Sequence, residues 1–218
     1  MVRGSLTVNV HNPDYRRSGH WGQPSVKRSF SVDTDSGLIE PARQCTSPNH
    51  DERPDGMLPD ALIVHGISLP PGKFGGPEIE KLFTNSLDWD VHPYFAGIRG
   101  LEVSAHLLIR RDGELIQFVP FDRRAWHAGE SNFRGRSCCN DFSLGVELEG
   151  DDETPYTDSQ YAVLIAVSNA LIAAYPALSA REVAAHSDVS PGRKTDPGPA
   201  FDWLRLYDGL SQNQPRIL

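Results

Sequence analysis

The residues of this chain best suited to chemistry lie in one loop-like stretch, HSDVSPGRKTDPGP, which runs from His186 to Pro199. The stretch holds an imidazole, an ammonium and a carboxylate within eleven positions, those of His186, Lys194 and Asp196. An imidazole nitrogen and a carboxylate oxygen are ligands of zinc in catalytic sites with three protein ligands. Because Lys194 lies two residues before Asp196, an extended backbone would point both side chains to one side, with the cation beside the metal. Taken alone, the stretch could also be a surface turn with scattered charges.

Histidines and glutamates elsewhere in the chain could complete such a site. His65 ends the apolar run ALIVH, and a side chain at the end of a buried strand can project into a cleft. Glu147 and Glu149 share the polar face of an alternating segment, so either a solvated strand face or a catalytic carboxylate would explain them. His106 faces away from the apolar side of its own segment, and His127, in RAWHAG, could be a substrate contact or a loop residue.

Zinc-dependent hydrolysis would explain why these groups are gathered. Three protein ligands leave a fourth position for water, and the metal lowers the pKa of that water towards ~7. A carboxylate must accept the proton and pass it to the leaving amine, and a fixed cation must meet the oxyanion of the intermediate. The prediction names five residues: His65, His186 and Asp196 as zinc ligands, Glu147 as general base and Lys194 as the cation.

The hydrophobic pattern predicts the elements that must position these residues, beginning at Ala61. Short alternating or apolar runs indicate strands, and the Arg111-Asp112-Gly113 turn indicates a hairpin. Pro77 opens a short helix, and a capping box from Thr157 to Gln160 opens a longer one that Pro176 stops. The expected strands are 61–65, 103–109, 114–119, 143–149 and 182–186, and a last helix carries Phe201, Trp203, Leu204 and Tyr207. We therefore expect an α/β fold of the mixed, α+β-like kind, with a central mixed β-sheet flanked by helices.

Composition limits the organisation of the chain and its partners. A length of 218 residues fits one domain with at most an appendage. Residues 1–31 have no apolar period and are predicted to be a flexible N-terminal extension, 32–210 the domain, and 211–218 a C-terminal tail. Within the domain, the proline-punctuated segment 36–59 is expected to be surface loop. A net charge of −8 argues against nucleic-acid binding, and no apolar segment suggests a signal peptide or a membrane span.

The cysteines indicate a reducing compartment. Cys45, Cys138 and Cys139 cannot form a paired framework, since their number is odd and adjacent cysteines rarely bridge each other. A cytoplasmic protein with reduced thiols is therefore expected, and a monomer is favoured.

Five ordered segments resemble the AmpD-type family of zinc-dependent N-acetylmuramoyl-L-alanine amidases. That family shares its fold with peptidoglycan recognition proteins and amidase-type phage lysozymes. The segments are LIVHGISLPPGKFGG (62–76), VSAHLLIRRDG (103–113), RAWHAGES (124–131), CNDFSLGVELEG (139–150) and GRKTDPGPAFDW (192–203).

The resemblance implies a role for each matching residue. It implies Zn²⁺ bound by His65, His186 and Asp196, with Glu147 as proton acceptor and Lys194 stabilising the transition state. The implied substrate is a muropeptide, cut in cytoplasmic peptidoglycan recycling between the lactyl group of (1,6-anhydro-)N-acetylmuramic acid and L-alanine. Further candidates for substrate contacts are His106, Trp126 and His127.

Three positions depart from the family pattern, and two other classes of protein stay open. Gly66 stands where asparagine is expected, and Glu102 and Cys138 stand where arginine is common, which concerns substrate anchoring rather than metal chemistry. A non-catalytic muropeptide-binding module typically lacks a zinc ligand, whereas this chain has all three. A cysteine amidase using Cys138 or Cys139 with His127 would leave the GRKTDPGP segment unexplained.

Overall fold

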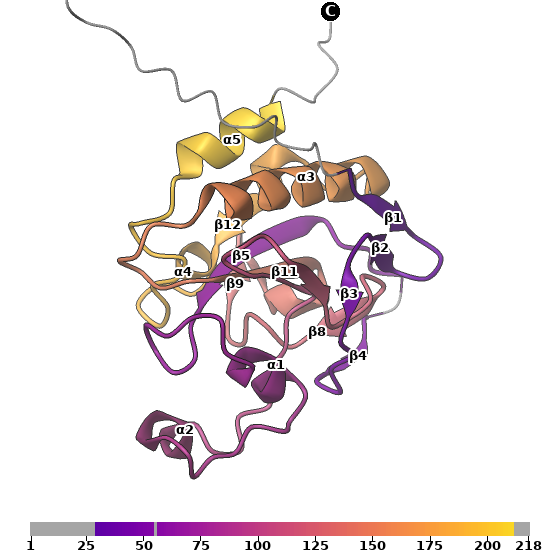
Figure 1. Ribbon diagram of the computed structural model, residues 1–218. Helices are drawn as coiled ribbons and strands as arrows, with labels where there is room; N and C mark the ends of the chain where they lie inside the picture. The colour runs from indigo at the N-terminus through magenta and orange to yellow at the C-terminus, as the bar shows by residue number, and fades with distance from the viewer. Residues whose placement is uncertain (1–28, 55, 212–218) are drawn as a thin grey trace, which may run out of the picture.

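A computed structural model describes residues 29–54 and 56–211 of the chain, and its centre is a mixed sheet of six strands (Figure 1). In spatial order the strands are β12 (Val183–Ala185), β5 (Ala61–Ile67), β11 (Ser143–Glu149), β6 (Leu107–Ile109), β7 (Leu115–Gln117) and β3 (Arg43–Gln44). Neighbours run parallel except for the antiparallel hairpin of β6 and β7. The expected central mixed sheet is confirmed.

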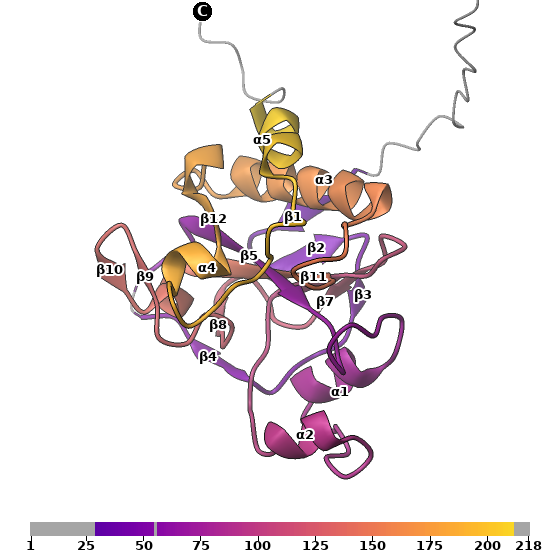
Figure 2. The ribbon, with the colours of Figure 1, turned by 90° about the vertical axis from the view of Figure 1, so that its left-hand side faces the viewer.

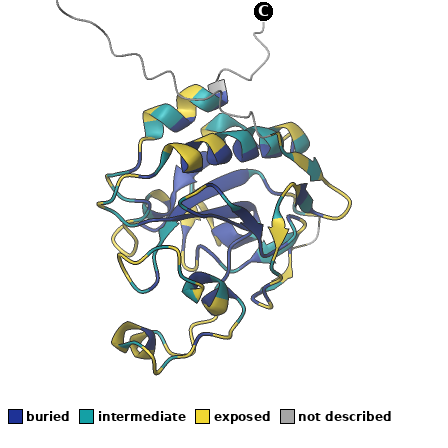
Figure 3. Cartoon of the chain, viewed as in Figure 1, coloured by how far each residue is buried: buried dark blue, intermediate teal, exposed yellow. Residues whose placement is uncertain are grey.

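The two central strands, β5 and β11, are buried on both faces, as the dark blue of Figure 3 shows. Leu62 and Val64 of β5 lie in one hydrophobic cluster with Leu144 and Val146 of β11 and with residues of the longest helix. Because side chains alternate along a strand, His65 projects from the opposite face.

The face with Leu62 and Val64 is covered by α3 (Asp158–Ala174), with α5 (Trp203–Ser211) lying over α3 (Figures 1 and 2). The capping box predicted at the start of α3 is present. Thr157 Oγ1 accepts from the N–H of Gln160 at 3.1 Å, and Gln160 Oε1 accepts from the N–H of Thr157 at 3.0 Å. The helix ends before Pro176, as expected from the loss of its N–H donor.

Two short helices lie on the other side of the sheet from α3 (Figure 1). In α1 (Glu78–Phe83), which Pro77 precedes as predicted, the buried side chains pack with Leu108 and Phe118. The sequence pattern did not indicate α2 (Pro93–Gly97), whose short span leaves no room for a helical period.

The prediction that 36–59 is surface loop is wrong in part. β2 (Leu38–Glu40) pairs with β1 (Ser31–Asp33), β3 joins the central sheet, and β4 (His50–Glu52) pairs with β8 (Arg123–Ala125). Strands of two or three residues are too short to show a period of two, so only their distant partners reveal them. The strand expected over 103–109 is likewise shorter, because only Leu107–Ile109 pairs with neighbours.

Smaller elements complete the described chain: β9 (Asn132–Phe133), β10 (Arg136–Ser137), η1 (Cys139–Asp141), η2 (Ala180–Glu182) and α4 (His186–Val189). Residues 1–28 of the predicted extension and most of the predicted tail lie outside the described residues. Phe30 packs against the core, and β1 begins at Ser31, so these two residues of the predicted extension are part of the fold. Within the described part of the chain, no helix is both long and apolar enough to cross a membrane.

Candidate active site

Three adjacent parallel strands deliver the predicted functional residues to one edge of the sheet. His65 lies near the end of β5, Glu147 is its register partner on β11, and His186 follows the last residue of β12. Carboxyl ends of parallel strands meet at the same edge, which is where open α/β sheets bind ligands. The strand arrangement therefore brings together residues that are far apart in sequence.

The last segment closes over this edge and adds Asp196. His186 is the first residue of α4, and the N–H of Ser187 donates to the carbonyl of Asp196 at 3.0 Å. The N–H of Lys194 donates to the carbonyl of Ser190 at 3.1 Å, which turns the chain back. These bonds fold the HSDVSPGRKTD stretch into a loop that returns to its own first histidine.

Three ligand atoms converge as a metal site requires. Nδ1 of His65 and Nδ1 of His186 are 2.8 Å apart, and Asp196 Oδ2 lies 3.4 Å and 3.0 Å from them. Four ligands at ordinary zinc bond lengths of about 2.05 Å are separated by about 3.3 Å in a tetrahedron. His65, His186 and Asp196 form a group that could hold a metal ion, and both the spacing and the donor types fit zinc.

The surroundings keep the ligands in the protonation states that a metal needs. Burial is the main cause that lowers the pKa of His65 to about 4, so its imidazole is neutral at neutral pH. Burial alone would raise the pKa of Asp196, but the adjacent imidazoles of His186 and His65 outweigh it, and the pKa lies below its ordinary value. Neutral imidazole and ionised carboxylate are the forms that bind zinc.

Glu147 is buried beside the ligands without a full set of hydrogen-bond partners. Its Oε1 lies 4.0 Å from Nδ1 of His65, and within the described structure its buried Oε2 has no partner. Burial, and next the carboxylate of Asp196, raise the pKa of Glu147 well above its ordinary value, while Lys194 opposes them. A carboxyl group with a raised pKa and a free oxygen is suited to accept a proton near neutral pH.

A groove with a volume of about 930 Å³ opens over this group of residues. Glu147, Lys194 and Asp196 line it, together with Trp126 and His127. The side chain of Lys194 is exposed in the groove, and the indole Nε1 of Trp126 is buried without a partner among the described residues. The arrangement leaves a cation and a carboxylate on the wall of one groove beside the candidate metal site.

The proposed contact of His106 with substrate needs correction. His106 is completely buried and lies outside the groove. Its Nδ1 accepts from the N–H of Gly145 at 2.9 Å, and its Nε2 lies 3.0 Å from the carbonyl of Arg123. The alternation of its segment shows correctly that His106 points away from one apolar face, but a second layer of structure covers the other face.

Sequence reasoning missed Arg193, which lines the groove next to Lys194. Its guanidinium donates to the carbonyls of Ala128 and Glu130, joining the GRKTD loop to the RAWHAGES segment. Its position directly before Lys194 was the available signal. Tyr94 of α2 also lines the groove, in a helix without a recognisable sequence pattern.

The three departures from the family pattern occupy different surroundings. A Cβ at Gly66 would lie 2.4 Å from the hydroxyl of Tyr156, so glycine here makes room for that tyrosine. Glu102 is exposed and lines the groove, whereas Cys138 is exposed outside it. Cys139 is also outside the groove, and burial raises the pKa of its thiol, so neither cysteine is placed as a nucleophile.

Comparison with known proteins shows the family of the chain. Residues 55–199 match the family described as N-acetylmuramoyl-L-alanine amidase. A relative from Citrobacter freundii, 1,6-anhydro-N-acetylmuramyl-L-alanine amidase AmpD, is 60% identical over 172 residues, which are 79% of this chain and 91% of the relative. A crystal structure of AmpD as its selenomethionine derivative has a TM-score of 0.79 and 57% identity, covering 82% of this chain and 98% of that one.

A more distant solved structure contains a bound substrate. It is the N-acetylmuramyl-L-alanine amidase AmiD from Escherichia coli with anhydro-N-acetylmuramic acid-L-Ala-D-gamma-Glu-L-Lys. Its TM-score is 0.52 with 28% identity, covering 72% of this chain and 60% of that chain. The matched segment contains the whole group of candidate residues, and the chain therefore belongs to the N-acetylmuramoyl-L-alanine amidase family.

Proposed function

We propose that this amidase uses zinc to hydrolyse the bond between the lactyl group of (1,6-anhydro-)N-acetylmuramic acid and L-alanine in muropeptides. The observation that carries the proposal is the convergence of His65, His186 and Asp196 beside a buried glutamate, one oxygen of which has no partner among the described residues. The high identity to proteins named for this reaction supports the choice of bond.

Zinc, when bound, would supply a Lewis acid that activates water and polarises the amide carbonyl. His65, His186 and Asp196 would hold it and leave one position open. Glu147 accepts the proton of the attacking water at its buried Oε2 and then donates it to the amide nitrogen as the C–N bond breaks. The raised pKa of Glu147 suits both transfers, because it makes the carboxylate a stronger base that can still release the proton.

Lys194 contributes a positive charge on the same wall of the groove. Its backbone is fixed by the bond to Ser190, and its ammonium lies close enough to Glu147 to lower the pKa of that carboxyl group. We propose that the ammonium stabilises the oxyanion that forms from the amide carbonyl in the transition state.

The groove is suited to a substrate of muropeptide size. Its volume of about 930 Å³ lies at the upper end of the usual range for small-molecule sites. Trp126 offers an apolar face for a sugar ring or lactyl group, and Glu102 and Arg193 place opposite charges along its walls. Free thiols at all three cysteines agree with the further proposal that the enzyme works in the cytoplasm.

The test is an assay of the purified full chain on anhydro-muropeptides, with mass spectrometry of the products and intact sacculi as the comparison substrate. Chelation should abolish release of the peptide, and zinc alone should restore it. A His186→Ala variant should lose its zinc at equal purity. Binding of muropeptide without cleavage would instead show a recognition module, and cleavage that survives chelation would exclude a metal-dependent reaction.

A further inference from the structure

We propose that His127 is a positioning residue that holds the imidazole of His65 with Nδ1 facing the metal. This inference rests on the proposed zinc site and adds a residue behind it. The sequence offers His127 as a substrate contact, and in the structure its ring also lies against a candidate ligand. It is 8% exposed, and its ring meets that of His65 edge to face, with centroids 5.0 Å apart.

A chain of three buried contacts leads away from the metal position. Nε2 of His65 lies 2.9 Å from Nδ1 of His127. Nε2 of His127 lies 3.1 Å from the hydroxyl of Ser143, and that hydroxyl donates to the carbonyl of Cys139 at 2.6 Å. His65, His127 and Ser143 are all buried.

The far end of this chain fixes the direction of every hydrogen bond. The carbonyl of Cys139 can only accept, so the one hydroxyl proton of Ser143 points to it. The hydroxyl oxygen must then accept from Nε2–H of His127. In an imidazole whose single N–H is directed at Ser143, the other ring nitrogen presents a lone pair. Nδ1 of His127 is therefore an acceptor, and His65 carries its proton on Nε2.

The consequence falls on the metal side of His65. With its proton on Nε2, the lone pair of Nδ1 faces Nδ1 of His186 and Oδ2 of Asp196, at 2.8 Å and 3.4 Å. Outer hydrogen bonds of this kind select the tautomer and orientation of a ligating histidine. The carbonyl of Cys139 thus determines, through two side chains, which nitrogen of His65 is free to bind.

Gly145 provides the space that His127 occupies. A Cβ at this position of β11 would lie 2.5 Å from Cγ of His127 and 2.7 Å from its Nδ1. Glycine inside a strand weakens it and marks a close approach of another group. Here the approaching group is the imidazole behind the metal site, so the strand and the ring fit each other.

The backbone next to His127 holds the second imidazole. Oδ1 of Asn140 accepts from the N–H groups of His127 and Ala128 at 3.2 Å and 2.7 Å. The carbonyl of Ala128 lies 3.3 Å from Nε2 of His186 and can accept its proton. One fixed dipeptide therefore orients both histidines, the first through a side chain and the second through a carbonyl.

The test measures zinc affinity by titration of the metal-free full chain against a chromophoric chelator. His127→Leu keeps bulk but leaves Nε2–H of His65 without an acceptor, so zinc should bind about 10- to 100-fold more weakly. His127→Asn places an amide oxygen near the position of Nδ1 and should recover part of that loss. The matched control is His106→Leu, which removes a second buried imidazole that lies edge to face against His127 but contacts neither histidine ligand. It should lower the melting temperature and leave the zinc affinity unchanged.

A second measurement needs no variant. Proton–nitrogen NMR of the imidazole rings in the zinc-loaded parent should show His65 and His127 each protonated on Nε2 alone. A proton on Nδ1 of His127, or a His127→Leu variant with parental zinc affinity, would overturn the inference. The proposed function would stand in either case, provided that the parent binds zinc. A parent that binds no zinc would instead remove the proposed function itself.

Discussion

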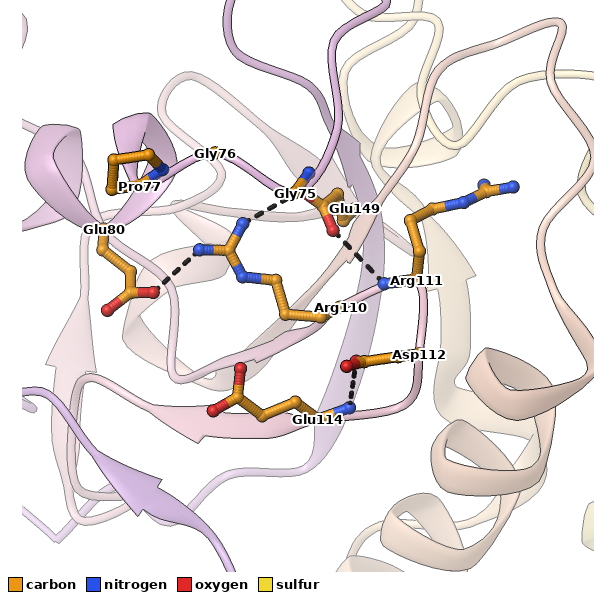
Figure 4. A pocket seen from close by; sticks show the side chains of 9 residues that line it. All are labelled: Gly75, Gly76, Pro77, Glu80, Arg110, Arg111, Asp112, Glu114 and Glu149. Atoms are coloured by element: carbon orange, nitrogen blue, oxygen red, sulfur yellow. Dashed lines mark hydrogen bonds and ion pairs between the residues drawn. The ribbon is translucent and has the colours of Figure 1, made fainter.

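Two glutamates on β11, only two residues apart, occupy opposite kinds of surroundings. Glu147 and Glu149 project from the same face of the strand, and both are buried, with 8% and 1% of their surface exposed. One lies at the candidate metal site and the other at the pocket shown in Figure 4. Residue type and face are the same, so the difference between them comes from what other segments bring.

Glu149 is surrounded by donors. Its Oε1 accepts from Arg110 Nη1 at 2.9 Å and from the N–H of Gly75 at 2.6 Å. Its Oε2 accepts from the N–H of Arg111 at 3.2 Å. Figure 4 shows Arg110 reaching on to Glu80, at 2.7 Å. An ionised carboxylate that accepts this many hydrogen bonds is stabilised in place, and it ties β11 to the loop before α1.

Glu147 has almost none of this support. Among the described residues no donor reaches its Oε2, and its pKa is raised. A buried carboxyl group in this state destabilises the folded chain but can accept a proton at neutral pH. The two glutamates show that a buried carboxylate with a full set of hydrogen bonds stabilises the fold, whereas one that lacks them is available for proton transfer.

Turnover gives the most direct test of the difference between the two glutamates. Glu147→Gln should keep zinc and lower turnover by on the order of 10²-fold or more, because an amide cannot accept the proton. Glu149→Gln should have a far smaller effect per folded, zinc-loaded molecule. Steady-state rates normalised to bound zinc provide the measurement, and equal losses at the two positions would assign the base to the wrong carboxylate.

The cations beside the two glutamates should differ in the same way. Lys194→Met should lower kcat by roughly 10²-fold with KM changed only a few-fold, since its charge acts on the oxyanion of the transition state. Arg110→Met should leave kcat per folded molecule nearly unchanged and reduce stability. A Lys194 variant with normal kcat and strongly raised KM would make the lysine an anchor for bound substrate instead.

The effects on stability should be in the opposite order, with the larger loss at Glu149. Glu149→Gln breaks a buried ion pair and should lower the free energy of unfolding by about 3 kcal/mol. Denaturant unfolding of the metal-free protein gives this quantity, and a double-mutant cycle with Arg110→Met isolates the pair. A loss no larger than that of an exposed substitution would show that the donors around Glu149 contribute little.

The smallest effect is a gain in stability at the site itself. A folded pKa above the unfolded one means that ionisation of Glu147 opposes folding, and this cost appears as pH rises above the unfolded value. Metal-free Glu147→Gln should therefore melt a few degrees higher than the parent at neutral pH, and the difference should vanish near pH 4 (below the ordinary carboxyl pKa of about 4.3). A variant that melts lower at neutral pH would show that the carboxylate is stabilised where it stands.

The sequence by itself predicted the parts of the site that depend on local pattern. Short apolar or alternating runs indicated the strands of His65 and Glu147, and the capping box gave the start of α3. Residue types and the spacing of the GRKTDPGP segment nominated the five residues that the structure brings together. These features are local because a strand or a helix end is specified by residues within a few positions of one another.

Only the tertiary structure decided what each nominated side chain touches. Alternation puts Glu147 and Glu149 on one face, but Arg110 and the N–H of Gly75 reach the second glutamate from segments 39 and 74 residues away in sequence. The same limit applies to His127, whose role follows from a hydrogen-bond chain that joins four separate parts of the fold. Periodicity reports which way a side chain points, while its protonation and partners depend on groups that arrive through the packing of distant segments.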